Sequence, residues 1–322
     1  MQHRVAIDVG SGYTNVKADG KDDLIFASRV CVAPPRWKQQ FGATEARVCR
    51  VGNKEWLIGP AVRAMGGTPE NTLSHTWSQS DGWMVLMYSA LAELDIEGDV
   101  YLATGLPQAV YEDQRDTLKE RLIGPHSFTI NDREYHVHIR DAFIIPQATA
   151  ALLYQTRMSQ DMAGDVGCID VGTFTTGLAV IDLDNGSLIV QRSSGMAIGV
   201  ATLLSALETH LANRYALHLD GPRLLLALQH QQVKVRGETI DLSGSIYEIA
   251  MQEAKPMLEF IQEMWNGGAD LDVFLAGGGA DYFARAIRSV VPHAQVIPDP
   301  QKAVARGLYN YLEKYLDSVA SS

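Results

Sequence analysis

Short apolar runs with strand-like alternation open both halves of the chain, and helical periodicity follows in each half. In the first half and then in the second, the opening strands are predicted over residues 4–9, 14–18, 24–27, 166–171, 176–183 and 187–193. Further strands are predicted over 46–51, 55–59, 100–104, 128–130, 135–139 and 272–276, with a hairpin over 233–242. Residues spaced as on one helix face predict helices over 81–94, 107–122, 146–153, 200–215, 243–265, 280–290 and 301–316.

Two residues refine the predicted bounds of the helices. Asp81 is the expected N-cap of its helix, because a short carboxylate can accept the first free N–H groups. Pro256 should kink or split the helix over 243–265, since proline removes one helical hydrogen bond. The order of elements predicts an α/β fold with mixed sheets flanked by helices, not an alternating parallel barrel.

A length of 322 residues suits two domains of ordinary size. We expect a first domain over 1–150 and a second over 151–322. Small inserted subdomains are expected at about 30–80, where Gly, Pro, Thr and Ser are frequent, and at about 200–270. The C-terminal helix is expected to pack back toward the first domain.

One short motif occurs twice. The two copies read Ile7-Asp8-Val9-Gly10-Ser11-Gly12-Tyr13-Thr14 and Ile169-Asp170-Val171-Gly172-Thr173-Phe174-Thr175-Thr176. A repeated strand–turn–strand unit predicts two related domains that face each other across a cleft. Either copy alone fits an ordinary hairpin turn, but two matched copies favour a nucleotide site.

The residue types in this repeat suit a phosphate chain and its metal. Glycine lets the backbone N–H groups approach phosphate oxygens, and the hydroxyl residues add donors. Asp8 and Asp170 would be repelled by phosphate, so they suit a magnesium ion that is held largely through its waters.

Composition narrows the class of protein. The formal net charge of −11 argues against direct, non-specific nucleic-acid binding, which needs a basic surface. No apolar run has the length of a membrane span, and the chain enters a strand at once, which leaves no room for a signal peptide. Cys31, Cys49 and Cys168 are scattered, as reduced thiols of a cytoplasmic protein are.

Three further sequence motifs are present in addition to the two turns. In chain order the five are the first turn, the helix after Ile145-Pro146-Gln147, the second turn, Leu275-Ala276-Gly277-Gly278-Gly279-Ala280, and Asp299-Pro300-Gln301-Lys302-Ala303-Val304-Ala305-Arg306-Gly307-Leu308. Together they resemble the five nucleotide motifs of the actin, DnaK-type chaperone and sugar-kinase superfamily. Within it the chain looks most like bacterial and archaeal actin-like ATPases of the ParM type.

That resemblance implies an ATPase that binds Mg·ATP between two domains, hydrolyses it slowly and assembles into filaments. It also implies a cytoplasmic protein whose filaments serve plasmid or DNA segregation, or intracellular positioning, through an adaptor protein.

The resemblance assigns roles residue by residue. It places the metal near Asp8 and Asp170, the catalytic aspartates. The phosphate loops match Gly10, Ser11, Gly12, Tyr13, Thr14, Gly172, Thr173, Phe174 and Thr175, and the adenosine loop matches Gly277, Gly278 and Gly279.

Gln147 matches the residue that orients the attacking water. Glutamine positions water but is a poor general base, which predicts slow hydrolysis. The alternative is an ordinary first-turn helix residue.

Two further assignments stay open. The residue that reaches the phosphates from the strand after the first loop is either Asn15, by register, or Lys17, by charge; Lys17 is otherwise a solvated strand residue. Glu248, Gln252 and Lys255 lie on neighbouring helix positions and are candidate adenine contacts, although such residues more often form a solvated face.

Two other functions fit the same fold. A small-molecule kinase needs a substrate base, for which Asp141 is the nearest candidate, although no kinase motif surrounds it. A nucleotide switch without assembly is the other. No Walker-type loop and no complete dinucleotide fingerprint are present, which argues against those nucleotide folds.

Overall fold

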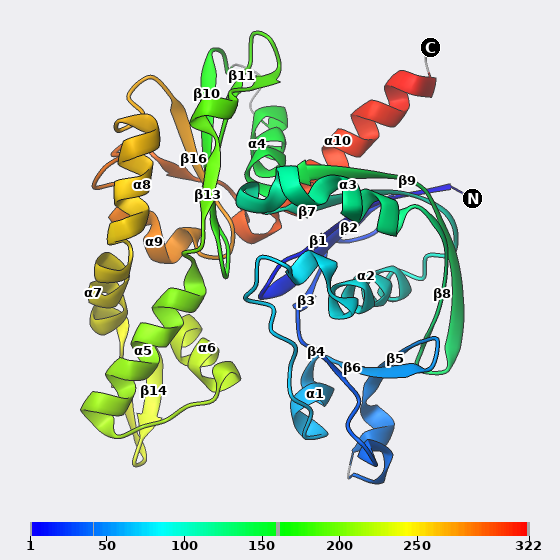
Figure 1. The fold of residues 1–322 in the computed structure, drawn as a ribbon. Helices are drawn as coiled ribbons and strands as arrows, with labels where there is room; N and C mark the ends of the chain where they lie inside the picture. The colour runs from blue at the N-terminus through cyan, green and yellow to red at the C-terminus, as the bar shows by residue number, and fades with distance from the viewer. Residues whose placement is uncertain (1, 41, 159–161, 321–322) are drawn as a thin grey trace. The chain divides into compact units, whose positions relative to one another are not determined.

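The computed structural model describes residues 2–40, 42–158 and 162–320. The chain divides into two compact units (Figure 1), one that runs to Met162 and resumes at Lys302, and one over Ala163–Gln301. The first unit ends at Met162 rather than near residue 150 because helix α4 (Gln147–Met158) packs on α10 (Ala303–Ala320) of the same unit. No helix in the described ranges has the length and apolar character needed to cross a membrane.

A nine-stranded mixed sheet organises the first unit. Its order is β3-β2-β1-β7-β9-β8-β5-β6-β4. The strands are β1 (Gln2–Val9), β2 (Tyr13–Ala18), β3 (Leu24–Ala27), β4 (Val30–Val32), β5 (Arg47–Val51), β6 (Lys54–Ile58), β7 (Gly98–Leu106), β8 (Gly124–Ile130) and β9 (Arg133–Pro146). Only the β1–β7 and β7–β9 pairs are parallel.

The second unit repeats the first five strands of that sheet. Its order is β12-β11-β10-β16-β17, with β13 also paired to β11. The strands are β10 (Asp165–Val171), β11 (Thr176–Asp182), β12 (Ser187–Leu188), β13 (Ser194–Met196), β16 (Asp272–Ala276) and β17 (Gln295–Val296). As in β3-β2-β1-β7-β9, two antiparallel pairs are followed by two parallel pairs. Each unit is therefore built on the same five-stranded mixed sheet.

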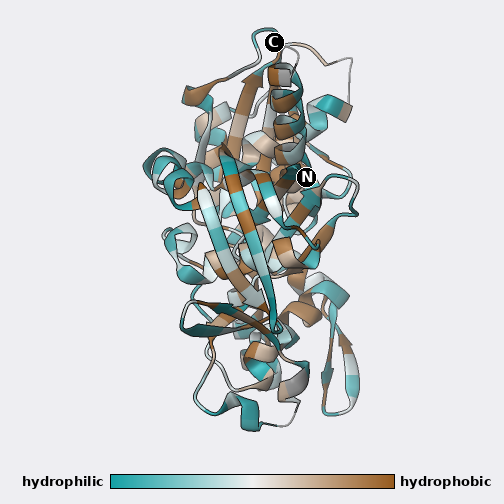
Figure 2. Ribbon diagram, turned by 90° about the vertical axis from the view of Figure 1, so that its right-hand side faces the viewer, coloured by the Kyte–Doolittle hydropathy of each residue, from teal (hydrophilic) through white to brown (hydrophobic). Residues whose placement is uncertain are grey.

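Helices cover these sheets. In the first unit they are α1 (Pro60–Ala64), α2 (Asp81–Glu93), α3 (Tyr111–Leu122), α4 and α10; in the second they are α5 (Val200–Tyr215), α6 (Gly221–His230), α7 (Ser243–Glu253), α8 (Lys255–Trp265) and α9 (Ala280–Ile287). A separate hairpin joins β14 (Gln232–Val235) to β15 (Glu238–Asp241). The strands and helices carry both hydrophobic and hydrophilic residues along their length (Figure 2).

Each unit has its own core. In the first, α2 is buried along almost its whole length, with Trp83 and Leu86 at 1% and 0% exposure. In the second, Phe283 of α9 and Trp265 of α8 join Leu207 of α5 in one cluster. Burying large apolar side chains of this kind is the main favourable term in folding.

Most predicted elements are confirmed, and the α5 bounds are those expected. Ser80, not Asp81, caps α2, because its hydroxyl accepts from the Trp83 amide at 3.0 Å. Pro256 splits its helix into α7 and α8 at Ala254. Pro146 ends β9, and α4 begins at Gln147.

Several boundaries were wrong, among them the end of β9, which runs to Pro146 rather than to residue 139. The strand over 187–193 is only Ser187–Leu188, followed by a 3₁₀ turn. A 3₁₀ turn also precedes α3, and α9 ends at Ile287 rather than near 290. Helices α1 and α6 and the short strands β4, β13 and β17 were not predicted.

Candidate functional site

The first repeated turn joins β1 to β2. The Gly10 amide donates to the Tyr13 carbonyl oxygen at 3.1 Å, which closes the turn. A Cβ atom at Gly10 would lie 2.9 Å from that oxygen, so the turn requires glycine here. The Gly12 carbonyl accepts from the Ser28 amide at 2.9 Å, which ties the turn to the end of β3.

The second turn, between β10 and β11, is closed in the same way. The Gly172 amide donates to the Thr175 carbonyl oxygen at 2.8 Å, and a Cβ at Gly172 would lie 3.1 Å from that oxygen. The carbonyls of Gly172 and Thr173 accept from the Val200 and Ala201 amides at the start of α5. Gly199, which the sequence analysis missed, permits this approach, because its Cβ would lie 2.5 Å from the Gly172 oxygen.

These contacts correct two expectations. The hydroxyl of Thr14 is buried and hydrogen-bonds Ser28 at 3.0 Å, and that of Thr176 donates to the Ile198 carbonyl at 2.7 Å. Neither hydroxyl is available as a donor to phosphate. The amides of Gly10 and Gly172 are used inside their turns as well, so these glycines shape the turns.

Six other predicted residues of the two turns are partly exposed and stay candidates for phosphate contact. They are Ser11, Gly12, Tyr13, Thr173, Phe174 and Thr175.

Asp8, the last polar residue of β1, lies in a cluster of amide side chains. The Gln147 Nε2 donates to its Oδ1 at 2.7 Å, although the two residues are far apart in the sequence. Asn15, its cross-strand partner on β2, also donates to it. Burial raises the pKa of Asp8 from 3.8 to about 6, because desolvation disfavours the charged form more than the two amides stabilise it.

Gly105, near the end of β7, makes this cluster possible. A Cβ at Gly105 would lie 2.8 Å from Gln147 Cγ and 3.4 Å from Asp8 Oδ1. The sequence analysis missed this glycine, because only the pairing of β1 with β7 brings it beside Asp8.

Asp170 lies beside the glycine triplet. It is 8% exposed, and a Cβ at Gly277 would lie 2.5 Å from its Oδ1. Gly277 also has φ +84°, which strongly favours glycine. The Gly279 amide donates to the Val171 carbonyl at 2.8 Å, so the triplet is held against the strand that ends in the second turn.

In the structure Asn15 and Lys17 have different contacts. The Lys17 ammonium lies 3.3 Å from Asp23 and donates to the Lys21 carbonyl at 3.0 Å. Asp23 also accepts from Arg306 of α10, and together the cations hold the pKa of Asp23 below its usual range. Lys17 is thus committed to a network at the end of β2 away from the turn, whereas Asn15 contacts Asp8.

The remaining candidates lie on other elements than the two turns. Glu248 and Gln252 are exposed on α7, and Lys255 is exposed at the start of α8. Their role as adenine contacts stays a prediction. Asp141, the candidate base of a kinase, forms an ion pair with Lys119 at 3.0 Å.

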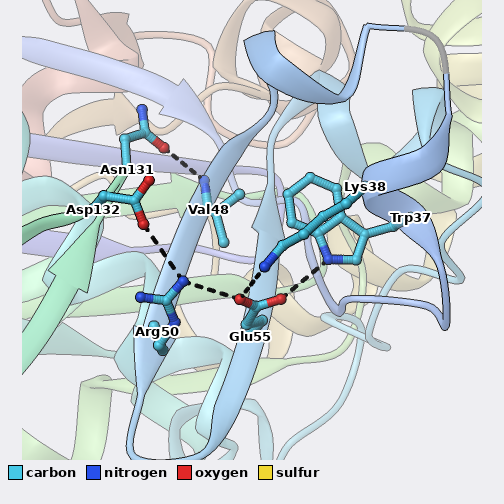
Figure 3. Close-up of polar contacts among 7 residues, drawn as sticks. All are labelled: Trp37, Lys38, Val48, Arg50, Glu55, Asn131 and Asp132. Carbon is cyan, nitrogen blue, oxygen red and sulfur yellow. Dashed lines mark hydrogen bonds and ion pairs between the residues drawn. The ribbon is translucent and has the colours of Figure 1, made fainter.

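A separate pocket of about 460 Å³ lies between β5 and the β8–β9 turn. Figure 3 shows that its charged side chains pair with one another: Glu55 accepts from Trp37, Lys38 and Arg50. These donors lower the pKa of Glu55 to about 2. The Asn131 side chain accepts from the Val48 amide at 2.9 Å, which clamps the turn onto β5. The pocket is held together by its own polar contacts.

The Asp8 cluster fits a hydrated divalent cation. The oxygen donors of a carboxylate and of amide side chains are those that Mg²⁺ and its bound waters prefer. The Asn15 Oδ1 is buried and has no hydrogen-bond partner among the described residues, so it can accept from such a water.

Two family models cover most of the chain. Residues 6–149 match the N-terminal domain of actin-like proteins, and residues 168–289 match the C-terminal domain of the MreB-like archaeal actin homologues. The chain belongs to the actin-like proteins.

Known relatives agree with this assignment. An archaeal actin homologue of Thermoplasma acidophilum is 26% identical over 323 residues, covering 92% of this chain and 94% of its own. The crystal structure of an archaeal actin homologue superposes with a TM-score of 0.82 at 22% identity, covering 97% of this chain and 99% of that one. A ParM filament structure from Clostridium botulinum gives 0.80 at 18% identity, with the same coverage. These likenesses confirm the actin-like fold with its two related mixed sheets.

Proposed function

We propose that this actin-like protein binds Mg·ATP with one repeated turn from each unit. The observation that carries the proposal is the duplication itself: the same closing hydrogen bond and the same aspartate two residues before the turn glycine occur in both units. An archaeal actin homologue of the same fold has been crystallised in complex with ADP, with a TM-score of 0.80 at 22% identity.

In this proposal the turn tips surround the phosphates, and the Gly277-Gly278-Gly279 segment lies along the adenosine. Asp8 and Asp170 hold Mg²⁺ largely through its waters. When bound, the ion neutralises charge on the phosphate oxygens. Glu248, Gln252 and Lys255 are the proposed adenine contacts.

Gln147 is proposed to orient the attacking water. Its Nε2 donates to Asp8, and in this proposal the side-chain carbonyl Oε1 accepts from the water. An amide accepts a hydrogen bond but does not remove a proton, so hydrolysis is expected to be slow.

We further propose that the protein assembles into filaments in its ATP-bound state and disassembles after hydrolysis. The support is the filament structure of a ParM relative with the same fold. Positioning of plasmid DNA or another cargo in the cytoplasm, through an adaptor protein, is the proposed use of such filaments.

Sedimentation tests the proposal. Purified protein is pelleted with Mg·ATP, with Mg·ADP and without nucleotide, while phosphate release is measured in parallel. We expect a pellet with ATP, and a much smaller one with ADP or without nucleotide. Phosphate release without a pellet at high protein concentration would indicate a switch. Phosphorylation of a sugar or vitamin by soluble protein would indicate a kinase.

A further inference from the structure

Asn15 has a side chain that is only half satisfied. It is 5% exposed, and its amide nitrogen donates to Asp8. Its Oδ1 is buried without a hydrogen-bond partner among the described residues. A buried carbonyl oxygen left unpaired is costly, so a position of this kind indicates a donor that arrives with a ligand.

The orientation of this amide is fixed by its neighbour. If the amide were flipped, Oδ1 would face the Asp8 carboxylate, and two acceptors would meet. Gln147 donates to the same carboxylate, and no described residue donates to the Asn15 Oδ1. With Asp8 ionised, the nitrogen must face Asp8 and the oxygen must face away from it.

The free atom is therefore an acceptor, and this decides the chemistry of its partner. Ionised phosphate oxygens are acceptors too, so they cannot pair with Oδ1. A water bound to a divalent cation is a strong donor, because the cation polarises its O–H bonds. Asp8, which lies in contact with Asn15, is the proposed ligand of that hydrated ion.

We propose that Asn15 accepts a hydrogen bond from a water of the bound Mg²⁺, and that it does not contact the phosphates. This inference rests on the proposed function, and it replaces the expectation that this strand supplies a phosphate donor. Asn15 then acts as a positioning residue that couples cation binding to nucleotide binding. The second turn has no equivalent, because Gly177 occupies the matching position opposite Asp170.

The experiment measures the affinity for a non-hydrolysable ATP analogue with saturating Mg²⁺ and with EDTA. The dissociation constant in EDTA is divided by the dissociation constant in Mg²⁺, and this ratio is compared between variants. For Asn15→Leu we expect unchanged affinity in EDTA and a ratio about tenfold smaller than in the wild type. For Asn15→Asp we expect a larger ratio, because the added carboxylate repels Asp8 and phosphate until the cation binds. Thermal unfolding shows whether each variant is folded.

Lys17→Met is the matched control on the same face of the same strand, and its ratio should equal that of the wild type. An Asn15→Leu affinity that falls equally in both conditions would mean that Asn15 contacts phosphate. An unchanged ratio in the folded variants would mean that Oδ1 meets only a structural water. If Asn15→Leu does not fold, an unchanged ratio in Asn15→Asp decides against the inference. A wild type that binds no nucleotide in either condition would reject the proposed function as well.

Discussion

Gly105 offers the most direct test of the Asp8 cluster. In Gly105→Ala the new methyl group would lie 2.8 Å from Gln147 Cγ, closer than non-bonded carbons approach. The side chain of Gln147 can move, but only by giving up its 2.7 Å hydrogen bond to Asp8. A hydrogen bond to a charged group is worth about 1.5–3 kcal/mol. We therefore expect kcat for ATP hydrolysis to fall about 10- to 100-fold, while the dissociation constant for ATP changes little.

A double-mutant cycle shows whether the effect passes through Gln147. Phosphate release is measured for Gly105→Ala, Gln147→Ala and the double variant. If the methyl group acts only by displacing Gln147, then Gly105→Ala adds nothing in the Gln147→Ala background. Gly244→Ala, with no atom within 4 Å of its Cβ, is the control for loss of a glycine. Additive losses in the cycle would refute the reasoning, as would an unchanged kcat in the single variant.

Three further predictions concern the aspartates and the glycine triplet. Because the pKa of Asp8 is about 6 in the folded protein and 3.8 in an exposed aspartate, its burial lowers the free energy of unfolding as pH rises from about 4 to 6. The loss is on the order of 3 kcal/mol. The melting temperature of Asp8→Asn should therefore exceed that of the wild type at pH 7.5 and equal it at pH 3.5. The same difference in melting temperature at both pH values would contradict this prediction. Gly277→Ala should lose about 2–4 kcal/mol in urea unfolding, because its Cβ would lie 2.3 Å from the Val171 oxygen, whereas Gly278→Ala should lose little. Asp170→Ala should abolish ATP-dependent pelleting, and a normal pellet would argue against its proposed role.

The sequence predicted the two turns because their chemistry is local. Asp, Gly and the flanking strands lie within eight residues in each copy, and the hydrophobic pattern sets the register on either side. Strand alternation also predicts the side of the sheet on which the Thr14 hydroxyl lies. Thr14 pairs with Val9, so it faces away from Asp8. Its residue type and its place in the phosphate loop predict a donor, whereas its side of the strand does not.

The Asp8 cluster could be predicted only in part. Gln147 was identified through its match to the family motif, but its contact with Asp8 depends on three strands of one sheet meeting at one edge. Gly105 has no motif of its own, and its importance lies in the space that a Cβ would fill. Asn15 and Lys17 share a face of β2, but Lys17 lies farther from the turn, since two residues along a strand span about 6–7 Å.

The two copies of the turn differ in a way that bears on their roles. In the first, the residue opposite Asp8 is an amide that leaves an acceptor unpaired, and Gln147 completes the cluster. In the second, Gly177 is opposite Asp170, and a glycine with positive φ brings backbone close to the carboxylate. The Asp8 carboxylate therefore accepts from two amide side chains, whereas the backbone at Gly277 lies close to Asp170. Under the proposed function, this difference predicts that the first turn orders water and cation for hydrolysis, while the second turn and Gly277 position the nucleotide.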